Sequence, residues 1–379
     1  MKKIVLVITG GSVSGALIEV PKTKGELPHI LRVTRENAPL GTPYDSTQFL
    51  ADLPARVSAV ATALGTTETS SVHVCLTAPL TLCQVQIVKE ETPEPHTVTK
   101  SELTQMIKKA GETFVQAHGS LLASLISGEP VSLESLLIGS LINGYFVTDP
   151  AGLSARTREF HLYTSVSSRA LMDTIKNAVS TAWPRHGDIS FSSFPYVAAQ
   201  AFNLLLPNRD NVIIINVGED HSEVLMIWND MIADRSIVTL GINTYLTEVG
   251  KALSLDVPNT LSTIRLYAEG GATPEASARI TEASRAVRDA WMKAFSLAAG
   301  SALEEFFLPD HVVILSDEPS VATALTRTLT NDLSRFSLSD SSFNFLPITD
   351  ELSTAFIFPE KVTLLPALML TSLFYARIG

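Results

Sequence analysis

Apolar and polar positions along the chain fall into two patterns: short apolar or alternating runs typical of strands, and wider spacings typical of helices. The chain opens with two apolar runs that flank a glycine turn, over 4–20. The same arrangement returns over 212–228, where the turn reads G-E-D-H-S-E. Helical segments follow each pair. A strand pair that recurs with later helices predicts a duplicated α/β architecture of two lobes with a cleft between them.

The same two patterns predict the remaining elements. Further strands are predicted over 72–78, 82–91, 136–150, 158–167, 188–193, 233–241 and 311–317. Helices are predicted over 48–64, 98–116, 167–183, 195–207, 244–253, 274–307, 321–329 and 362–377. A loop rich in proline and glycine lies around 40–46, before the first of these helices.

The region 81–185 differs from the rest in its order of strand, helix, strand, strand, helix. Its alternating strands are typical of half-exposed sheets, and Thr99 with Glu102 forms a capping box before its first helix. We interpret this region as a small α+β domain inserted into the first lobe. The predicted domains are the first lobe at 1–80 and 186–209, the insert at 81–185, the second lobe at 210–350 with a helical part at about 254–307, and a C-terminal helix at 351–379 that packs back on the fold.

Composition narrows the class of protein. Hydrophobic residues make up 45% of the 379 and charged residues 18%, which favours a well-packed globular protein. A net charge of −11 argues against nucleic acid as a partner, because the phosphate backbone is recognised by positive surfaces. Cys75 and Cys83 match no disulfide or zinc pattern and are predicted to be buried thiols, and the histidines form no metal-ligand cluster.

The N-terminal run MKKIVLVIT imitates a signal peptide, but it breaks at Gly10-Gly11, so Ile4–Ile8 is interpreted as the first strand. No stretch has the roughly 18–20 apolar residues that span a bilayer. The segment near 362–377 comes nearest, and it is too short. The sequence therefore predicts no direct membrane insertion.

Three features of the layout belong together. The run IINVGEDHSEVLMI at 214–227 lies where the actin/Hsp70-type ATPases have D-I-G-G-G-T-T-D in their second phosphate hairpin. The segment DRSIVTLGINTYLTEVGKAL at 234–253 matches the strand, glycine turn and helix that follow that hairpin. The insert precedes DISFSSFPYVAAQAF, where two bacterial members place a small domain. The chain thus resembles FtsA, of cell division, and PilM, of type IV pilus assembly. Taken alone, 211–228 is better explained as an ordinary hairpin with an acidic turn, and only the combination of the three features favours the family.

The resemblance implies a nucleotide site, with ATP and Mg²⁺ as the cofactors, between the two hairpins. In that family small residues let backbone N–H groups approach the phosphates, and an aspartate in each hairpin serves the metal. Here Val7 and Asn216 stand at the aspartate positions. The residues that would bind nucleotide, if binding is retained, are Gly10, Gly11, Ser12, Asn216, Gly218, Ser222, Gly241 and Ser316.

The motif residues that would touch the ligand have changed. Glu219 and Asp220 replace glycines, and each carboxylate about 4 Å from a phosphate costs about 4 kcal/mol at an effective dielectric of about 20. Ser316 and Asp317 replace the glycine pair beside the adenine. We therefore expect that ATP hydrolysis is lost, with no catalytic residue and no metal ligand assigned. The alternative is an active ATPase that uses Asp220 or Glu223 for the metal. A metabolite kinase of the related fold ranks last.

The resemblance also implies partners. PilM binds a short N-terminal peptide of a membrane protein, and FtsA binds the tubulin-like division protein and can self-associate into filaments. Strand edges of the insert, at 82–90 and 158–167, are the predicted contact surface. The residues assigned to it are Val85, Ile87, Phe160, Leu162 and Tyr163. No basic amphipathic tail follows the last helix, which favours a PilM-like cytoplasmic scaffold, peripheral at the inner face of the membrane.

Overall fold

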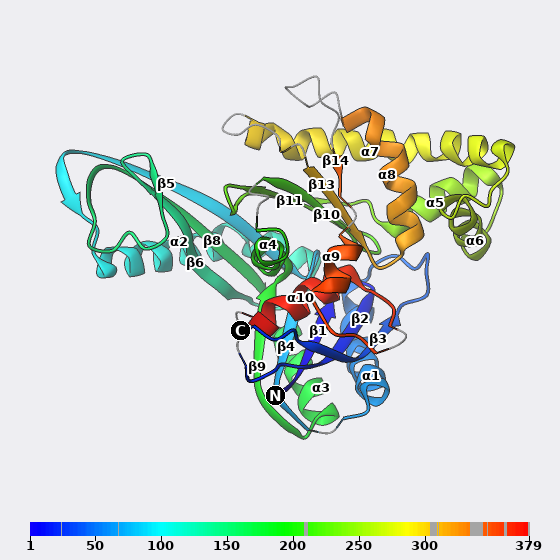
Figure 1. Ribbon diagram of the computed structural model, residues 1–379, viewed down its shortest axis with the longest axis horizontal. Coiled ribbons are helices and arrows are strands. Elements are labelled where there is room, and N and C mark those ends of the chain that lie inside the picture. Colours follow the sequence, from blue (N-terminus) through cyan, green and yellow to red (C-terminus); the bar gives the residue numbers. More distant parts are fainter. Residues whose placement is uncertain are drawn as a thin grey trace.

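The computed structural model describes residues 1–23, 25–66, 68–207, 211–303, 309, 311–333, 344–346, 348–359 and 362–377. Within these ranges the strands form three sheets, two of five strands and one of four. The two larger sheets form the cores of two lobes, and the smaller sheet projects from one side of the molecule (Figure 1).

The first lobe is built on a mixed sheet. Its strands are β1 Lys2–Ile8, β2 Ser12–Glu19, β3 His29–Asn37, β4 Glu68–Leu76 and β9 Arg185–Ser193, in the order β3-β2-β1-β4-β9. The hairpin predicted at 4–20 is β1 and β2. Helices α1 (Ser46–Leu64) and α3 (Arg169–Ala182) cover the outer face. Asp45 caps the start of α1, and Gly65 ends it with a left-handed φ of 64°, a conformation that glycine adopts without steric cost.

The second lobe repeats this plan. Its strands are β10 Val212–Val217, β11 Ser222–Trp228, β12 Met231–Val238, β13 His311–Ser316 and β14 Asn344–Phe345, in the order β12-β11-β10-β13-β14. If the strands of each lobe are numbered by their order along the chain, both sheets have the spatial order 3-2-1-4-5. The predicted duplication is therefore confirmed. The outer face is covered by α5 Ile242–Leu253, α6 Val257–Ala268, α7 Pro274–Leu303 and α8 Pro319–Leu333.

Two helices fill the space between the sheets: α4 (Phe194–Leu205) and α10 (Pro366–Arg377), with the short α9 (Thr349–Thr354) beside α10 (Figure 1). The apolar helix α10 is buried on all sides from Pro366 to Tyr375. One hydrophobic cluster joins these helices to the inner faces of both sheets. Because β1 and β10 are each covered on both faces, they read as continuous apolar runs.

The insert is a four-stranded antiparallel sheet with one helix on it. The strands are β5 Thr81–Thr97, β6 Pro130–Ile142, β7 Tyr145–Val147 and β8 Ser154–Ser168, in the order β5-β8-β6-β7. Helix α2 (Lys100–Leu125) begins at the capping box predicted from Thr99 and Glu102. The predicted range 81–185 also contains α3, but α3 packs against α1 and contributes to the core of the first lobe.

Four of the described elements were not predicted individually: β3, β14, α9 and α6, of which α6 falls within the predicted helical part at about 254–307. Apolar and polar residues alternate only in part along the β3 segment HILRVTREN. Proline-containing loops on both sides weaken this signal further. β14 and α9 are too short to show a period. Residues 304–307 of the predicted helical part lie outside the described residues. Cys75 and Cys83 are buried free thiols, as predicted.

Candidate functional site: the junction between the two lobes

The first glycine turn, between β1 and β2, is organised by a threonine hydroxyl. The N–H groups of Gly11 and Ser12 donate to Thr9 Oγ1 over 3.1 and 2.8 Å. Arg56 on α1 holds the same turn by donating from Nη1 to the Gly11 carbonyl over 2.9 Å. Two of the backbone donors that the resemblance assigns to phosphate, those of Gly11 and Ser12, are therefore engaged within the protein.

The second turn, between β10 and β11, is fastened to helix α5. The Gly218 and Glu219 carbonyls accept from the N–H groups of Ile242 and Asn243, over 2.9 and 2.8 Å. A Cβ at Gly241 would lie 2.5 Å from the Glu219 carbonyl oxygen, so only glycine permits this close approach. Ser222 Oγ donates to the Leu240 carbonyl over 2.6 Å. The Gly218 and Glu219 carbonyls and the Ser222 hydroxyl of this turn are therefore bonded within the second lobe.

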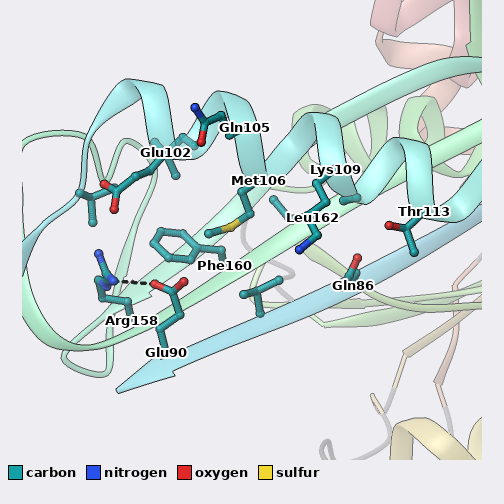
Figure 2. Close-up of a pocket in the computed structure, with 14 residues that line it drawn as sticks. Gln86, Glu90, Glu102, Gln105, Met106, Lys109, Thr113, Arg158, Phe160 and Leu162 are labelled. Atoms are coloured by element: carbon teal, nitrogen blue, oxygen red, sulfur yellow. Dashed lines mark ion pairs between the residues drawn. The ribbon is translucent and has the colours of Figure 1, made fainter. Parts of the chain in front are cut away.

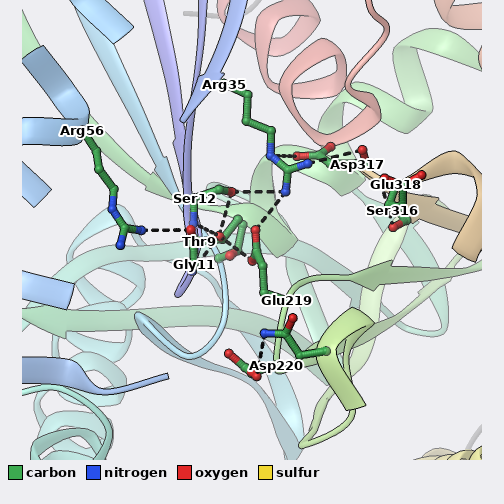
Figure 3. Close-up of polar contacts among 12 residues, drawn as sticks. Thr9, Gly11, Ser12, Arg35, Arg56, Glu219, Asp220, Ser316, Asp317 and Glu318 are labelled. Atoms are coloured by element: carbon green, nitrogen blue, oxygen red, sulfur yellow. Dashed lines mark hydrogen bonds and ion pairs between the residues drawn. The ribbon is translucent and has the colours of Figure 1, made fainter. Parts of the chain in front are cut away.

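Glu219 crosses from the second turn into the first. Its Oε2 accepts from the Thr9 hydroxyl over 2.7 Å, and its Oε1 pairs with Arg35 Nη2 at 2.9 Å (Figure 3). A Cβ at Gly11 would lie 2.7 Å from Glu219 Cγ, so the Glu219 side chain occupies the space beside the glycine turn. The carboxylate predicted to repel a phosphate instead lies beside the first glycine turn, which the resemblance assigns to phosphate.

Arg35 extends this network to the adenine side of the junction. It lies on β3 of the first lobe, and its Nε is 3.6 Å from Asp317 Oδ2 while its Nη1 donates to the Asp317 carbonyl over 3.3 Å. Burial raises the pKa of Asp317, and the positive charge of Arg35 opposes that rise. One first-lobe guanidinium thus binds two second-lobe carboxylates (Figure 3). We call Thr9, Arg35, Glu219 and Asp317 the interlobe clamp.

A loop closes the junction from the other side. Asn243 Oδ1 accepts from the Gly41 N–H over 2.8 Å, and its Nδ2 donates to the Thr42 carbonyl over 3.2 Å and to Asp220 Oδ1 over 3.1 Å. Burial raises the pKa of Asp220, which the hydrogen bond from Asn243 partly offsets. The second replaced glycine therefore also has an internal partner.

The space left at the turns does not fit a nucleotide. A cavity of about 120 Å³ remains beside Gly10 and Gly11, whereas small-molecule sites usually enclose about 300–1,000 Å³. Val7, at the metal position of the first hairpin, is buried in the hydrophobic core, and Asn216 is buried in β10. Among the described residues, no group of three or more His, Cys, Asp or Glu side chains is arranged to hold a metal.

The residues assigned to nucleotide divide into two groups. Gly10 and Gly11 line the small cavity, whereas Ser12 and Ser222 are fully buried. Ser316, at the end of β13, accepts from the Glu318 N–H over 3.2 Å. Sequence reasoning missed Thr9 and Arg35. Partial alternation around Arg35 is the one signal that could have placed it on a strand beside the first hairpin.

The residues assigned to partner binding are largely inaccessible. Phe160 and Leu162 are each 1% exposed and lie under α2, and Tyr163 is fully buried against Ser193, with 2.7 Å between their hydroxyl oxygens. Val85 and Ile87 are half-buried on the opposite face of the sheet. The prediction of an exposed edge at 158–167 is wrong, because β8 lies between β5 and β6. The edge strands of this sheet are β5 and the short β7.

Comparison with known proteins yields similarity of structure only. No protein-family model matches the chain, and no curated protein matches its sequence. A solved structure of the PilM-PilN type IV pilus biogenesis complex superposes with a TM-score of 0.69 at 13% identity, covering 100% of this chain and 99% of that one. The fold is that of PilM.

Two further solved structures match with lower scores. The ethanolamine utilization protein EutJ from Carboxydothermus hydrogenoformans has a TM-score of 0.45 at 11% identity, covering 100% of this chain and 90% of that one. A Bacteroides thetaiotaomicron protein with an actin-like ATPase fold has a TM-score of 0.41 at 8% identity, covering 89% of each chain. The PilM-like fold agrees with the resemblance inferred from sequence. The interlobe clamp lies where the resemblance places the nucleotide.

Proposed function

We propose that the chain is an actin-like scaffold of a type IV pilus assembly machine that works without ATP hydrolysis. It binds the cytoplasmic tail of a membrane protein and lies at the inner face of the membrane. The likeness in fold to PilM over the whole chain supports the scaffold role. No helix within the described ranges is long and apolar enough to cross a membrane. Self-association into an oligomer is part of this proposal.

The observation that carries the loss of ATP hydrolysis is Glu219 against Gly11. In a nucleotide-dependent member of this fold, phosphates would draw the two hairpins together. Here Thr9 and Arg35 of the first lobe bind Glu219 of the second directly, over 2.7 and 2.9 Å. The contact between lobes that a ligand would supply is supplied by side chains, so the closed arrangement needs no ligand.

The alternative of an active ATPase would use Asp220 or Glu223 for the metal. Asp220 accepts from Asn243, and Glu223 Oε1 pairs with Arg235 at 2.6 Å, with side chains 3% and 5% exposed. Glu223 Oε2 has no hydrogen-bond partner among the described residues, but it is buried away from solvent. The geometry therefore favours the scaffold. The similarity in fold to PilM supports the pilus over the division pathway suggested by FtsA.

The proposal is tested by binding. Synthetic cytoplasmic tails of the type IV pilus inner-membrane proteins from the same genome are offered to the immobilised chain, with and without Mg-ATP. We expect saturable binding of one tail with the same affinity in both conditions. Absence of binding to every tail, or binding that requires Mg-ATP, would contradict the proposal.

A further inference from the structure

A groove runs along the insert between β5 and α2 (Figure 2). Its volume is about 390 Å³, within the range of sites that hold ligands. The groove exists because α2 packs over β6 and β8 more than over β5. One face of the edge strand β5 is therefore only partly covered, and the sheet ends there.

The groove has an apolar floor and a polar rim. Phe160 and Leu162 of β8 form the floor with Val88 of β5, and Met106 of α2 leans over it (Figure 2). Lys109 and Thr113 of α2, together with Gln86 of β5, stand along the rim. An apolar floor bounded by polar side chains is typical of a site that takes alternate side chains of an extended segment.

Arg158 lies at one end of the groove and has an N–H donor without an acceptor among the described residues. Its side chain is 7% exposed, and its Nη2 pairs with Glu90 Oε2 at 2.6 Å. Its Nε is buried and has no hydrogen-bond partner. Buried donors nearly always find an acceptor, so this one indicates a missing partner. Because Glu90 already neutralises the guanidinium, a neutral acceptor such as a main-chain carbonyl fits better than a second carboxylate.

We propose that this groove docks an extended peptide segment of a partner protein, which adds as a strand along the edge of β5. The segment is about five residues long, matching the run from Gln86 to Glu90. Its alternate apolar side chains enter the groove above Val88 and Phe160, and one of its carbonyls accepts from Arg158 Nε. This proposal rests on the scaffold function, and it identifies where the membrane-protein tail binds.

Two pairs of variants test the groove. Thr113→Arg places a long charged side chain over it, and Thr104→Arg is the matched control, since Thr104 is exposed on the same helix outside the groove. Val88→Lys alters the floor, and Val131→Lys is the matched control, since Val131 is a half-buried valine of β6 that does not line the groove. Thermal unfolding of each variant checks that it is folded, and the exposed threonine pair keeps the test valid should a strand variant fail.

The probe is a displayed library of random peptides of about 12 residues, selected on the wild-type chain. We expect selected peptides with alternating apolar residues. Their affinity should fall at least about tenfold for Thr113→Arg and Val88→Lys, and stay unchanged for both controls. They should also slow amide exchange in β5. The proposal would be overturned if no peptide were recovered, or if the recovered peptides bound the groove variants as tightly as the wild type.

A second copy of the chain is a competing occupant. If the wild type forms a dimer in sedimentation and Thr113→Arg abolishes it while Thr104→Arg does not, the groove binds the chain itself and the proposal is wrong. Failure of the groove and failure of the scaffold function are distinguishable. Tails that bind despite Thr113→Arg refute the groove alone, whereas tails that never bind wild type refute the function.

Discussion

Arg35 is the residue on which the junction depends most. The Arg35 side chain is only 17% exposed, and the side chains of its partners Glu219 and Asp317 are 8% and 11% exposed. Removing one partner of a buried pair leaves the other charge without compensation, which is more costly than never having had the pair. The clamp therefore holds the lobes most strongly through this single side chain.

We predict that Arg35→Leu lowers the free energy of unfolding by about 3–5 kcal/mol, because Glu219 and Asp317 remain buried and unpaired. Urea unfolding measures the change. Arg185→Leu is the matched control: its pair with Glu68 has side chains 76% and 64% exposed, so the loss should stay below about 1 kcal/mol. Equal losses in the two variants would show that the clamp is not a buried ion pair.

His73 gives a second residue-scale prediction. Its ring stacks on Tyr375 of α10 with centroids 4.1 Å apart, and burial, together with the charge of Lys3, lowers its pKa from 6.5 to about 4. The folded state favours the neutral ring, so the stabilisation is complete above pH 6.5 and is lost as pH falls toward 4.

Between pH 7 and 5 this loss amounts to about 2 kcal/mol. Urea unfolding of His73→Gln, which cannot titrate, should show a pH dependence shallower by that amount. If wild type and variant lose stability in parallel on acidification, His73 titrates normally and the interpretation fails.

Single residues were the least predictable level. The patterns placed Gly10, Gly11 and Glu219 in the two turns, and the carboxylates were predicted to repel a phosphate. Sequence does not show that Glu219 has a partner 184 positions away, since Arg35 meets it only after the lobes close. The buried state of Phe160 and Leu162 was missed because their strand was taken as an edge, and alternation does not give strand order.

At the scale of elements, the insert contrasts a central strand with an edge strand. β8 pairs on both sides, with β5 and with β6, whereas within the described part of the chain β5 pairs with β8 alone. Strands on the edge of a sheet offer backbone groups for pairing and exchange their amides more readily than central strands.

We therefore predict that, without a partner, peptides covering Leu82–Val88 of β5 exchange hydrogen faster than peptides covering Phe160–Val166 of β8. Hydrogen–deuterium exchange with mass spectrometry measures this directly. Equal protection of both strands in the free protein would mean that another segment or another copy already covers β5, and the groove would not be open for a partner.

Elements with a clear period were the most predictable. The hairpins β1–β2 and β10–β11, and helix α1, follow the predicted ranges closely, because burial imposes a period on each of them. β3 was missed although it carries Arg35, since nine residues with partial alternation between loops give a weak signal. The capping box of α2 was found because its two residues act on neighbouring backbone groups.

At the scale of the molecule, the lobes are joined in two ways. Helices α4 and α10 share one hydrophobic cluster with both sheets, and the interlobe clamp adds polar contacts at the turns. Proteins of this architecture can respond to a ligand only if that ligand distinguishes an open from a closed state. Under the proposed function, the chain's own side chains stabilise the closed state in place of nucleotide.

That claim is tested most directly by thermal unfolding of the purified wild-type chain with and without millimolar Mg-ATP. A ligand that binds only the folded state at about 100 times its Kd adds about 2.7 kcal/mol, which raises the melting temperature by several degrees. We predict the same melting temperature in both conditions. A clear rise would mean that Glu219 yields its place to a phosphate, and it would contradict the nucleotide-independent scaffold.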